Sequence, residues 1–386
     1  MAKPVTAVNH KILTWARERS GQTVDQVAAA LNKDPKVVAA WERGDDAPSY
    51  PQLEKLAYQV YKRPLAVFFF PTPPPEEDPT ISFRTLPEFE IEQLIADTRI
   101  KIRHARARQL SLTELNDGKN PAEQKIFADL RGGPNVSPSE TAAKVRDYLG
   151  IHATMQRAWK DTEQALKAWR RAVEDKGVYV FKNSFKQKDV SGFCLYDAEF
   201  PIIYINNSTA QTRQIFTILH ELGHVLTATG GVTKRDDSYI AKLTGQERQI
   251  EAFCNRFAAE ALLPLAEFKK ALGQNPASDQ SISQIASAYR VSRHVVLLRL
   301  LGLKLVSQAF YAKKAAEWKA DYDAKKPETP GGSYYATQGS YLGEKYLKLA
   351  FGKYYDGSIS IEQLADHLNV KVSNVPGMEQ LAMQAD

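Results

Sequence analysis

Cysteine is scarce in this sequence, which contains only Cys194 and Cys254 among 386 residues. Two cysteines are too few for the disulfide framework of a small secreted domain or for a thiolate zinc site, so we expect both to be buried as small apolar residues. A long apolar run is also missing, because the one continuous stretch of note, Leu65–Phe70, is far too short to cross a bilayer. Since residues 1–5 show no apolar core of a secretory signal, we predict a cytoplasmic protein with no membrane partner.

A strong excess of one charge sign is absent as well. Lys and Arg total 51, Asp and Glu total 45, and the net charge of +6 is spread over the whole chain. This balance permits a nucleic-acid or acidic partner but is weak evidence for one. With 43% apolar and 25% charged residues, the composition is that of a globular protein, and the length predicts two or three domains.

Proline marks the clearest domain boundary. Residues 71–79 contain five prolines and three consecutive acids, a composition that extends the backbone and prevents a helix. On this basis, and on the motifs described below, we divide the chain into five parts. They are an N-terminal helical domain at 1–70, a Pro-rich linker at 71–89, a helical connecting region at 90–174, a domain with a small sheet at 175–305, and a C-terminal region of unknown role at 306–386.

The periodicity of apolar residues predicts a mainly α protein with a small β-sheet, which is an α+β fold. The predicted helices are 90–112, 138–149, 160–175, 209–227, 246–263, 265–272, 281–289, 292–303 and 360–368. The predicted strands are 177–181, 192–196 and 201–205, where the period falls to two or the apolar run is short. Gly230 and Gly231 are typical C-terminal signals for the helix at 209–227, and a polar loop containing Lys234 is expected next.

The run HELGH at residues 220–224 lies in the middle of a predicted helix. Because His220 and His224 are four residues apart, both imidazoles lie on one helix face and can reach one tetrahedral metal. Glu221 projects beside the open coordination position, where a carboxylate can take a proton from water and pass it to a leaving amine. Gly223 stands where a bulky side chain would crowd the metal. The spacing predicts one Zn²⁺ per chain, with Glu221 as the catalytic base.

A catalytic zinc needs a third protein ligand and an open fourth position. Thr227 and Gly230 occupy the places at which the extended HExxHxxGxxH motif has its glycine and third histidine, so the ligand must lie elsewhere. In the next predicted helix Glu251 and Asn255 are spaced i and i+4. Glu251 can therefore coordinate the metal while Asn255 lies beside a metal-bound histidine. Glu247, one turn earlier, competes for the ligand role.

Residues 251–264, with the sequence EAFCNRFAAEALLP, and the HELGH run closely resemble the two signature helices of the ImmA/IrrE family of metallopeptidases. The resemblance covers about residues 175–300. It implies a zincin-like peptidase domain at 175–305, gluzincin-like in its ligands, with Glu251 as the third ligand and Glu221 as the base. It also implies that the protein substrate is a repressor, cleaved in a bacterial or phage stress or mobile-element response.

Other interpretations stay open on the sequence alone. The histidine pair could belong to an apolar core without any metal. A metal site could also have lost its activity or act only as a sensor, although an intact Glu221 argues against loss. A peptidase could instead cut its own linker near 71–79. The donor that stabilises the oxyanion is unassigned, and Tyr196 and Tyr204 are the nearby candidates.

Residues 23–43 predict two short helices joined by a tight turn, with Asp34 as the N-cap of the second helix and Pro35 at its first position. Three further segments, Trp41–Gly44, Ala47–Ser49 and Gln52–Ala57, complete a resemblance to the lambda-repressor-type (XRE) helix-turn-helix family. This resemblance covers about residues 8–68. It implies a five-helix-type domain at 1–70 whose second motif helix enters the major groove of DNA.

The expected contacts of this module to DNA are Lys33, Lys36 and Arg43. Residues 1–63 carry ten basic and seven acidic residues, which gives a net charge of only +3. Strong electrostatic attraction to DNA phosphates is therefore not evident. Dimerisation would multiply each contact, which makes a homodimer an expected assembly. The expected partners are DNA and a protein substrate. The alternatives are a helix-turn-helix that recognises protein, and a DNA-binding repressor or antitoxin whose metal domain senses or binds a partner without proteolysis.

Overall fold

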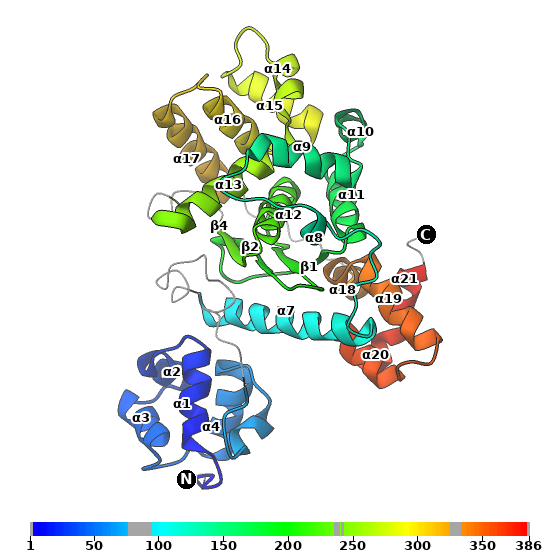
Figure 1. Ribbon diagram of the computed structural model, residues 1–386. Helices are drawn as coiled ribbons and strands as arrows, with labels where there is room; N and C mark the ends of the chain where they lie inside the picture. Colours follow the sequence, from blue (N-terminus) through cyan, green and yellow to red (C-terminus); the bar gives the residue numbers. More distant parts are fainter. Residues whose placement is uncertain (1–2, 76–93, 235–239, 241–242, 325–332, 384–386) are drawn as a thin grey trace. The chain divides into compact units, whose positions relative to one another are not determined.

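The protein is described here by a computed structural model that covers residues 3–75, 94–234, 240, 243–324 and 333–383 (Figure 1). The chain forms two compact units: unit 1 comprises residues 1–106 with 185–187, and unit 2 comprises residues 107–184 with 188–386. Most of the predicted linker at 71–89, from residue 76 onward, lies outside the described residues. Within the described ranges, no helix combines the length and apolar character needed to cross a membrane.

Unit 1 is a group of short helices that begin at capping side chains. Asn9 caps the first helix, Thr23 forms a capping box at the second, and Asp34 caps the third with Pro35 at its first position, as predicted. Asn32, at φ 54°, ends the second helix in the left-handed region. The helices are α1 (His10–Arg19), α2 (Val24–Leu31), α3 (Pro35–Arg43), α4 (Tyr50–Lys55), η1 (Leu56–Val60) and η2 (Leu65–Phe69), followed by α7 (Ala96–Leu115), which continues into unit 2. Their shared core includes Ile12, Ala16, Val27, Val38, Trp41 and Leu53.

Unit 2 contains a four-stranded mixed sheet with the strand order β1–β3–β2–β4. The strands are β1 (Tyr179–Asn183), β2 (Val190–Leu195), β3 (Ile202–Asn206) and β4 (Gly231–Lys234). β1 and β3 are parallel, whereas β2 is antiparallel to both β3 and β4, with Cys194 opposite Ile203 on one side and Gly231 on the other. The first three strands confirm the predicted α+β class, and β4 adds an edge strand where a polar loop was expected.

One face of the sheet is covered by helices and holds the main core of unit 2 (Figure 1). α12 (Gln211–Leu226) lies on β2, β3 and β4, and thirteen of its sixteen residues are buried, so it is an internal helix. α13 (Gly245–Leu262) packs along α12, α9 (Pro138–Leu149) packs on α13, and α11 (Thr162–Asp175) packs on α12 and β1. The other helices of this part are α8 (Ile126–Asp129), α10 (Ala153–Ala158), α14 (Leu265–Ala271), α15 (Asp279–Tyr289), α16 (Arg293–Gly302) and α17 (Gln308–Ala324).

The opposite face of the sheet is covered by the end of α7 and by the C-terminal helices. The Phe181 ring of β1 lies 6.0 Å from the ring of Tyr204 and 5.2 Å from that of Tyr346 on α19. From α7, Gln109 Nε2 donates a hydrogen bond to the Phe200 carbonyl at 3.0 Å. The C-terminal helices are α18 (Tyr334–Leu342), α19 (Glu344–Tyr355), α20 (Ile361–Leu368), η4 (Val372–Asn374) and α21 (Val375–Met383). The C-terminal region therefore supplies part of the core of unit 2, a role that the sequence pattern did not indicate.

Predicted and observed helices agree within two residues at both ends for α9, α11, α12, α13, α14, α15, α16 and α20. The first residues of the helix predicted at 90–112 lie outside the described part of the chain, and its observed end is Leu115. Four helices of the C-terminal region, α17, α18, α19 and α21, were not predicted. α17 shows no apolar face, but α19 buries Tyr346, Leu347, Ala350 and Phe351, whose spacing places them on one helix face.

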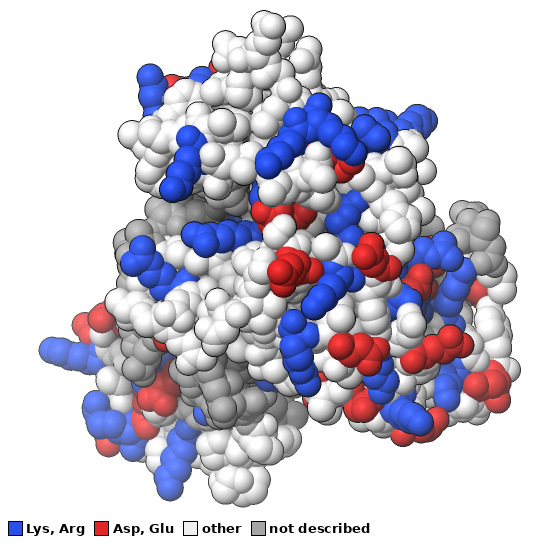
Figure 2. All heavy atoms as spheres, turned by 45° about the horizontal axis from the view of Figure 1, so that its top comes forward, with Lys and Arg blue, Asp and Glu red and all other residues white. Residues whose placement is uncertain are grey.

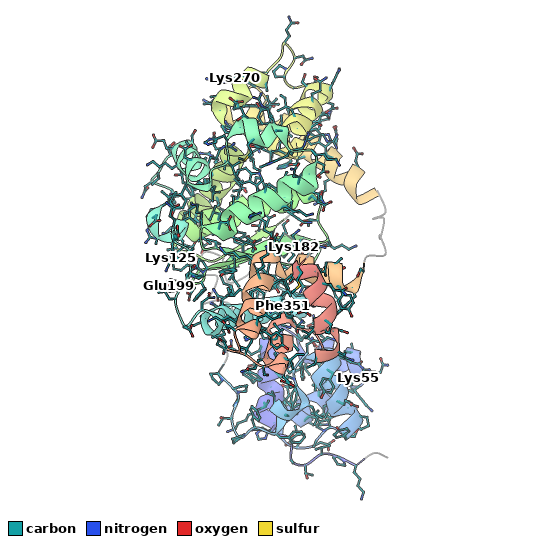
Figure 3. All side chains as sticks on the ribbon, turned by 90° about the vertical axis from the view of Figure 1, so that its right-hand side faces the viewer. Lys55, Lys125, Lys182, Glu199, Lys270 and Phe351 are labelled. Atoms are coloured by element: carbon teal, nitrogen blue, oxygen red, sulfur yellow. The ribbon has the colours of Figure 1, made fainter. Side chains whose placement is uncertain are left out.

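Lys182 on β1 is buried beside α11, and this burial predicts a pH-dependent stability (Figure 3). Burial lowers the pKa of the Lys182 ammonium group from 10.5 to about 7. Between pH 7 and 10.5 the unfolded chain therefore binds more protons than the folded chain. The free energy of unfolding rises with pH across this window. Lys182→Met is expected to raise the free energy of unfolding by roughly 2–4 kcal/mol at pH 6–7, because one pKa unit corresponds to about 1.4 kcal/mol.

Urea unfolding at pH 6, 7.5 and 9.5 in the presence of a chelator measures this effect. The gap between Lys182→Met and the natural protein should shrink as the pH rises. Lys167→Met, on a side chain of α11 that is 76% exposed, is the matched control and should change little. A gap that is the same at all three pH values would contradict the assignment.

Candidate metal centre

α12 carries the HELGH run, and its two histidines lie one turn apart on the same side of the helix. His220, Glu221 and His224 have no exposed surface. Polar side chains at full burial are stable only when other groups satisfy them. The partners of these three side chains therefore define the site.

α13 passes close to α12 at the level of the histidines, and Gly223 permits this approach. A Cβ added at Gly223 would lie 3.0 Å from Cys254 Sγ and 3.2 Å from the Phe257 ring, both on α13. The missing side chain of Gly223 thus leaves room for α13, a role that the sequence did not indicate. The close approach of the two helices brings the Glu251 carboxylate to the histidines.

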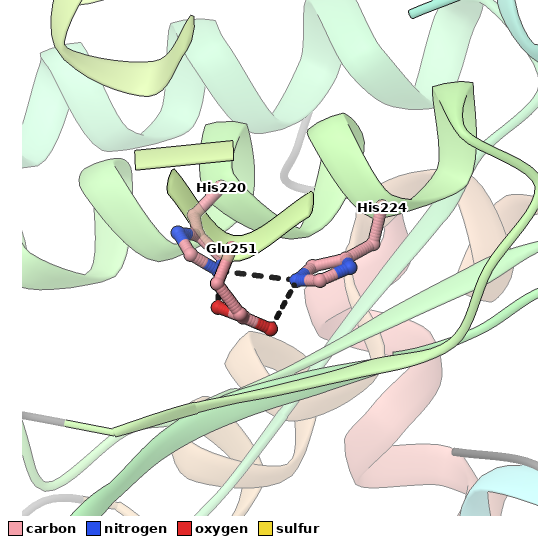
Figure 4. A group of neighbouring side chains, drawn as sticks. All are labelled: His220, His224 and Glu251. Carbon is pink, nitrogen blue, oxygen red and sulfur yellow. Dashed lines mark hydrogen bonds and ion pairs between the residues drawn. The ribbon is translucent and has the colours of Figure 1, made fainter. Parts of the chain in front are cut away.

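Figure 4 shows His220, His224 and Glu251 facing one another in a single group. The two Nε2 atoms of the histidines are 3.2 Å apart. Glu251 Oε2 lies 3.4 Å from His220 Nε2, and Glu251 Oε1 lies 3.1 Å from His224 Nε2. The competing acid Glu247 is partly exposed, one turn earlier on α13, and it does not belong to this group of described residues. The structure thus brings together the three side chains that the sequence proposed as ligands.

The second ring nitrogen of each histidine also has a partner. His220 Nδ1 lies 2.8 Å from Asn255 Oδ1, and His224 Nδ1 lies 3.3 Å from Thr229 Oγ1. Because an amide oxygen only accepts, His220 Nδ1 donates the proton and its Nε2 presents a lone pair to the group. Asn255 lies where the i, i+4 spacing predicted. Thr229 was not predicted, because it follows the end of α12 and no helical spacing relates it to the motif.

The electrostatics of the group favour a cation. Burial raises the pKa of the Glu251 carboxyl, but the two imidazoles outweigh burial and hold this pKa well below its usual range. Burial lowers the pKa of the His224 imidazole, but Cys254 and Glu251 raise it well above its usual value. An ionised carboxylate that faces two ring nitrogens at 3.1–3.4 Å is stabilised by positive charge between them.

The three donor groups fit a tetrahedral zinc ion. Zn²⁺ holds imidazole nitrogen and carboxylate oxygen at about 2.0–2.2 Å, so neighbouring ligand atoms of a tetrahedron are about 3.3–3.6 Å apart. The observed separations of 3.1, 3.2 and 3.4 Å are close to this length. Two histidines and one glutamate are also a donor set of catalytic zinc sites, in which the fourth position is open to water or substrate.

Glu221 lies beside this group with its two carboxylate oxygens in different surroundings. Oε1 accepts a hydrogen bond from the Thr233 hydroxyl of β4. Oε2 is buried and accepts no hydrogen bond of ordinary geometry from any described residue. Burial raises the pKa of the Glu221 carboxyl, and the two imidazoles oppose this shift. A carboxyl whose pKa is raised binds a proton more readily than an exposed one, which suits a group that accepts a proton and releases it again.

β4 contributes Gly231 as well as Thr233 to the site. A Cβ added at Gly231 would lie 2.4 Å from the ring of His224, so the strand passes directly against this histidine. The interpretation of Gly230 and Gly231 as the end of the helix is wrong: α12 ends at Leu226, and Ala228 takes the left-handed conformation at φ 54°. A glycine pair after a helix can either end that helix or let a following strand pass close to a side chain. Only the tertiary structure distinguishes these two roles.

Gly231→Ala is therefore expected to weaken metal binding by roughly tenfold or more, since the added methyl group must displace either the strand or the His224 ring. Competition for Zn²⁺ against a chromophoric chelator measures the affinity. Gly273→Ala is the matched control, because a Cβ at Gly273 meets no atom within 4 Å. Equal zinc affinity in both variants would show that β4 does not constrain His224.

Both cysteines are free and buried, as predicted, and they border the site. The Cys194 thiol neighbours Glu221, and the Cys254 thiol neighbours His224. Burial raises the pKa of both thiols, so both stay protonated near neutral pH. Cys194 on β2 and Cys254 on α13 thus place small side chains where these elements pack against α12.

Tyr204 was a wrong candidate for the oxyanion donor. Its ring stacks on Phe193 at 5.3 Å and packs near Phe181 on the face of the sheet opposite α12. Side chains of a strand alternate between the two faces, so Ile203 and Ile205 face the helices and Tyr204 faces away. A tyrosine on that face cannot contact a group bound at the histidines.

The predicted DNA contacts all lie on or next to α3 in unit 1. Lys33 precedes the helix and Lys36 lies in its first turn, and both are exposed. Arg43 is exposed in the last turn, and its Nε lies 2.7 Å from a carboxylate oxygen of Asp45. Asp45 thus partly neutralises the charge of Arg43.

Comparison with known proteins bears on the residues of this site. No curated protein matches the chain. A family model does match residues 173–301, a stretch that begins near the end of α11, ends in α16 and contains the whole metal group with Glu221 and Thr233. On the geometry described above and this match, residues 173–301 are similar to the IrrE N-terminal-like domain of the peptidase M78 family, which is a family of the metallopeptidase type.

Proposed function

We propose that unit 2 is a zinc-dependent endopeptidase, with one Zn²⁺ held by His220, His224 and Glu251 and with Glu221 as the general base. The observation that carries this proposal is the convergence of two imidazole Nε2 atoms and one ionised carboxylate within 3.1–3.4 Å of one another at full burial. Apolar side chains would fill such a position at lower cost if nothing were bound there. The match to a metallopeptidase-type family model over the same residues supports the proposal.

The residues of the site divide the chemistry among them. When bound, Zn²⁺ supplies a Lewis acid that polarises a peptide carbonyl and makes a water more acidic. Asn255 and Thr229 hold the two imidazole rings through their Nδ1 atoms. Glu221 accepts the proton of the attacking water at a carboxylate oxygen and then gives it to the amine nitrogen as the C–N bond breaks. Full burial of Glu221 keeps bulk water away from this transfer.

Activity is tested with the full chain, prepared metal-free and then loaded with Zn²⁺. The substrates are candidate repressor proteins, chosen because the family resemblance implies cleavage of a repressor. Mass spectrometry of the products locates the cut and also shows whether the chain cuts itself near residues 71–79. Zinc-dependent cleavage of a partner supports the peptidase. Zinc binding without any cleavage, combined with a stable complex with a repressor, favours the alternative of a sensor that binds a partner without proteolysis.

We further propose that unit 1 binds DNA through α3. The supporting observations are the tight turn at Asn32 between α2 and α3, and the exposed positions of Lys33 and Lys36 at the start of α3. Acidic and basic side chains are mixed over the lower part of the face drawn in Figure 2, whereas its upper part carries mostly Lys and Arg. The proposed contact of α3 rests on few charges, because Arg43 is paired with Asp45. A homodimer would double these contacts.

Binding of the full chain to a fluorescent 30-base-pair duplex of mixed sequence, measured from 50 to 200 mM salt, tests this second proposal. Each phosphate contact adds about 0.9 to the slope of log affinity against log salt. The Lys33→Gln, Lys36→Gln double variant should therefore have a slope smaller by about two. Lys270→Gln, on the exposed end of α14, is the control. An unchanged slope in the double variant would leave unit 1 as a module for protein recognition.

A further inference from the structure

We infer that Thr233 is a positioning residue for Glu221, an inference that rests on the proposed function and deepens it. The Thr233 side chain is 2% exposed, and its hydroxyl donates to Glu221 Oε1 across the space between β4 and α12. The other oxygen, Oε2, accepts no hydrogen bond of ordinary geometry from a described residue, and its neighbour Cys194 offers only a weakly donating thiol. The two carboxylate oxygens are therefore inequivalent, and Oε2 is the one left to accept a proton.

The position of Thr233 is determined by the pairing of β2 and β4. Thr233 pairs with Gly192, and Gly231 pairs with Cys194, so Thr233 and Gly231 point to the same face of the sheet as Cys194, toward α12. Gly192 has no side chain to compete for this space, and a Cβ there would lie 2.6 Å from Thr217 Cγ2. Since a β-branched side chain in a strand has few rotamers, the strand register places the hydroxyl at Glu221.

This placement has a consequence for the proton transfers of peptide hydrolysis. A free carboxylate rotates about its last bond and presents either oxygen. The bond from Thr233 opposes this rotation and directs Oε2 toward the transferred proton. Oε2 takes the proton as the O–H bond of the water breaks, and it returns that proton to the amine nitrogen as the C–N bond breaks. Thr233 itself keeps its proton and touches none of the reacting atoms.

The kinetic test compares Thr233→Val, which keeps the shape and removes the hydroxyl, with Thr233→Ser, which restores it. Thr233→Val should lower kcat by roughly 10–100-fold with KM within about twofold and zinc content unchanged, because orientation of the base acts in the reaction step. Thr233→Ser should recover most of kcat. Thr217→Val is the matched control: its buried hydroxyl donates to the Arg213 carbonyl and not to Glu221. Full kcat in Thr233→Val, or no recovery in Thr233→Ser, overturns the inference.

A second measurement does not depend on peptidase activity. In the metal-free protein, the unfolding midpoint is measured for Thr233→Val, for Glu221→Leu, which removes both carboxylate oxygens, and for the double variant. If the hydroxyl holds the carboxylate, the shift of the double variant is smaller than the sum of the two single shifts. Additive shifts overturn the inference even if the peptidase is active. If the natural protein is inactive with zinc bound, the proposed function is overturned instead. The non-additivity of the unfolding midpoints then decides by itself whether Thr233 holds Glu221.

Discussion

Glu221→Gln is expected to lower the rate of peptide hydrolysis by roughly 10²–10⁴-fold while one zinc ion stays bound. The substitution keeps the shape of the side chain and removes its ability to take up and release a proton, which is the contribution of a general base. The metal ligands are not altered, because His220, His224 and Glu251 form the cluster without Glu221. The measurements are cleavage of a partner protein by the zinc-loaded chain and metal content by mass spectrometry.

Two outcomes would contradict the assigned role. Glu221→Gln with full activity would show that another group moves the proton. Glu221→Gln with neither metal nor activity would show that this carboxylate is part of the metal site and not the base beside it. Glu199→Gln is a suitable control for the loss of a carboxylate in unit 2, because Glu199 pairs with Lys125 outside the metal site at 2.6 Å (Figure 3).

Glu251→Ala is expected to reduce the zinc content from one ion per chain to almost none after dialysis against a weak chelator. Two imidazoles 3.2 Å apart then remain without the carboxylate that completes the set. Removing one of three protein ligands lowers affinity far more than altering a neighbouring group, for which the loss is about 10–100-fold. Mass spectrometry under native conditions counts the ions directly.

Glu247→Ala is the matched control for this experiment. Both acids are on α13 one turn apart, but only Glu251 is fully buried and faces the histidines, whereas Glu247 is partly exposed. Retention of zinc by Glu251→Ala together with its loss from Glu247→Ala would reverse the assignment. Retention by both variants would show that the two histidines find their third ligand elsewhere.

Local spacing was enough to propose most of the metal group. The i, i+4 rule applies within one helix whatever surrounds it, so His220 and His224 were paired, and Asn255 was placed one turn from Glu251, before any tertiary contact was known. Spacing alone did not choose between Glu251 and Glu247, which lie one turn apart on the same helix. The packing of α13 on α12 through Gly223 makes this choice, because it determines which turn of α13 faces the histidines.

The sequence by itself determined the α+β class, most helix bounds, the HELGH helix and the caps of α2 and α3, because each depends on residues within about one turn of one another. Only the tertiary structure decided that β4 is a strand, that Gly231 passes the ring of His224, and that Thr233 reaches Glu221. It also decided that the C-terminal helices complete the core behind the sheet. These contacts join segments that are far apart in the chain. The periodicity of one segment shows which of its faces is buried, but not which other segment packs against that face.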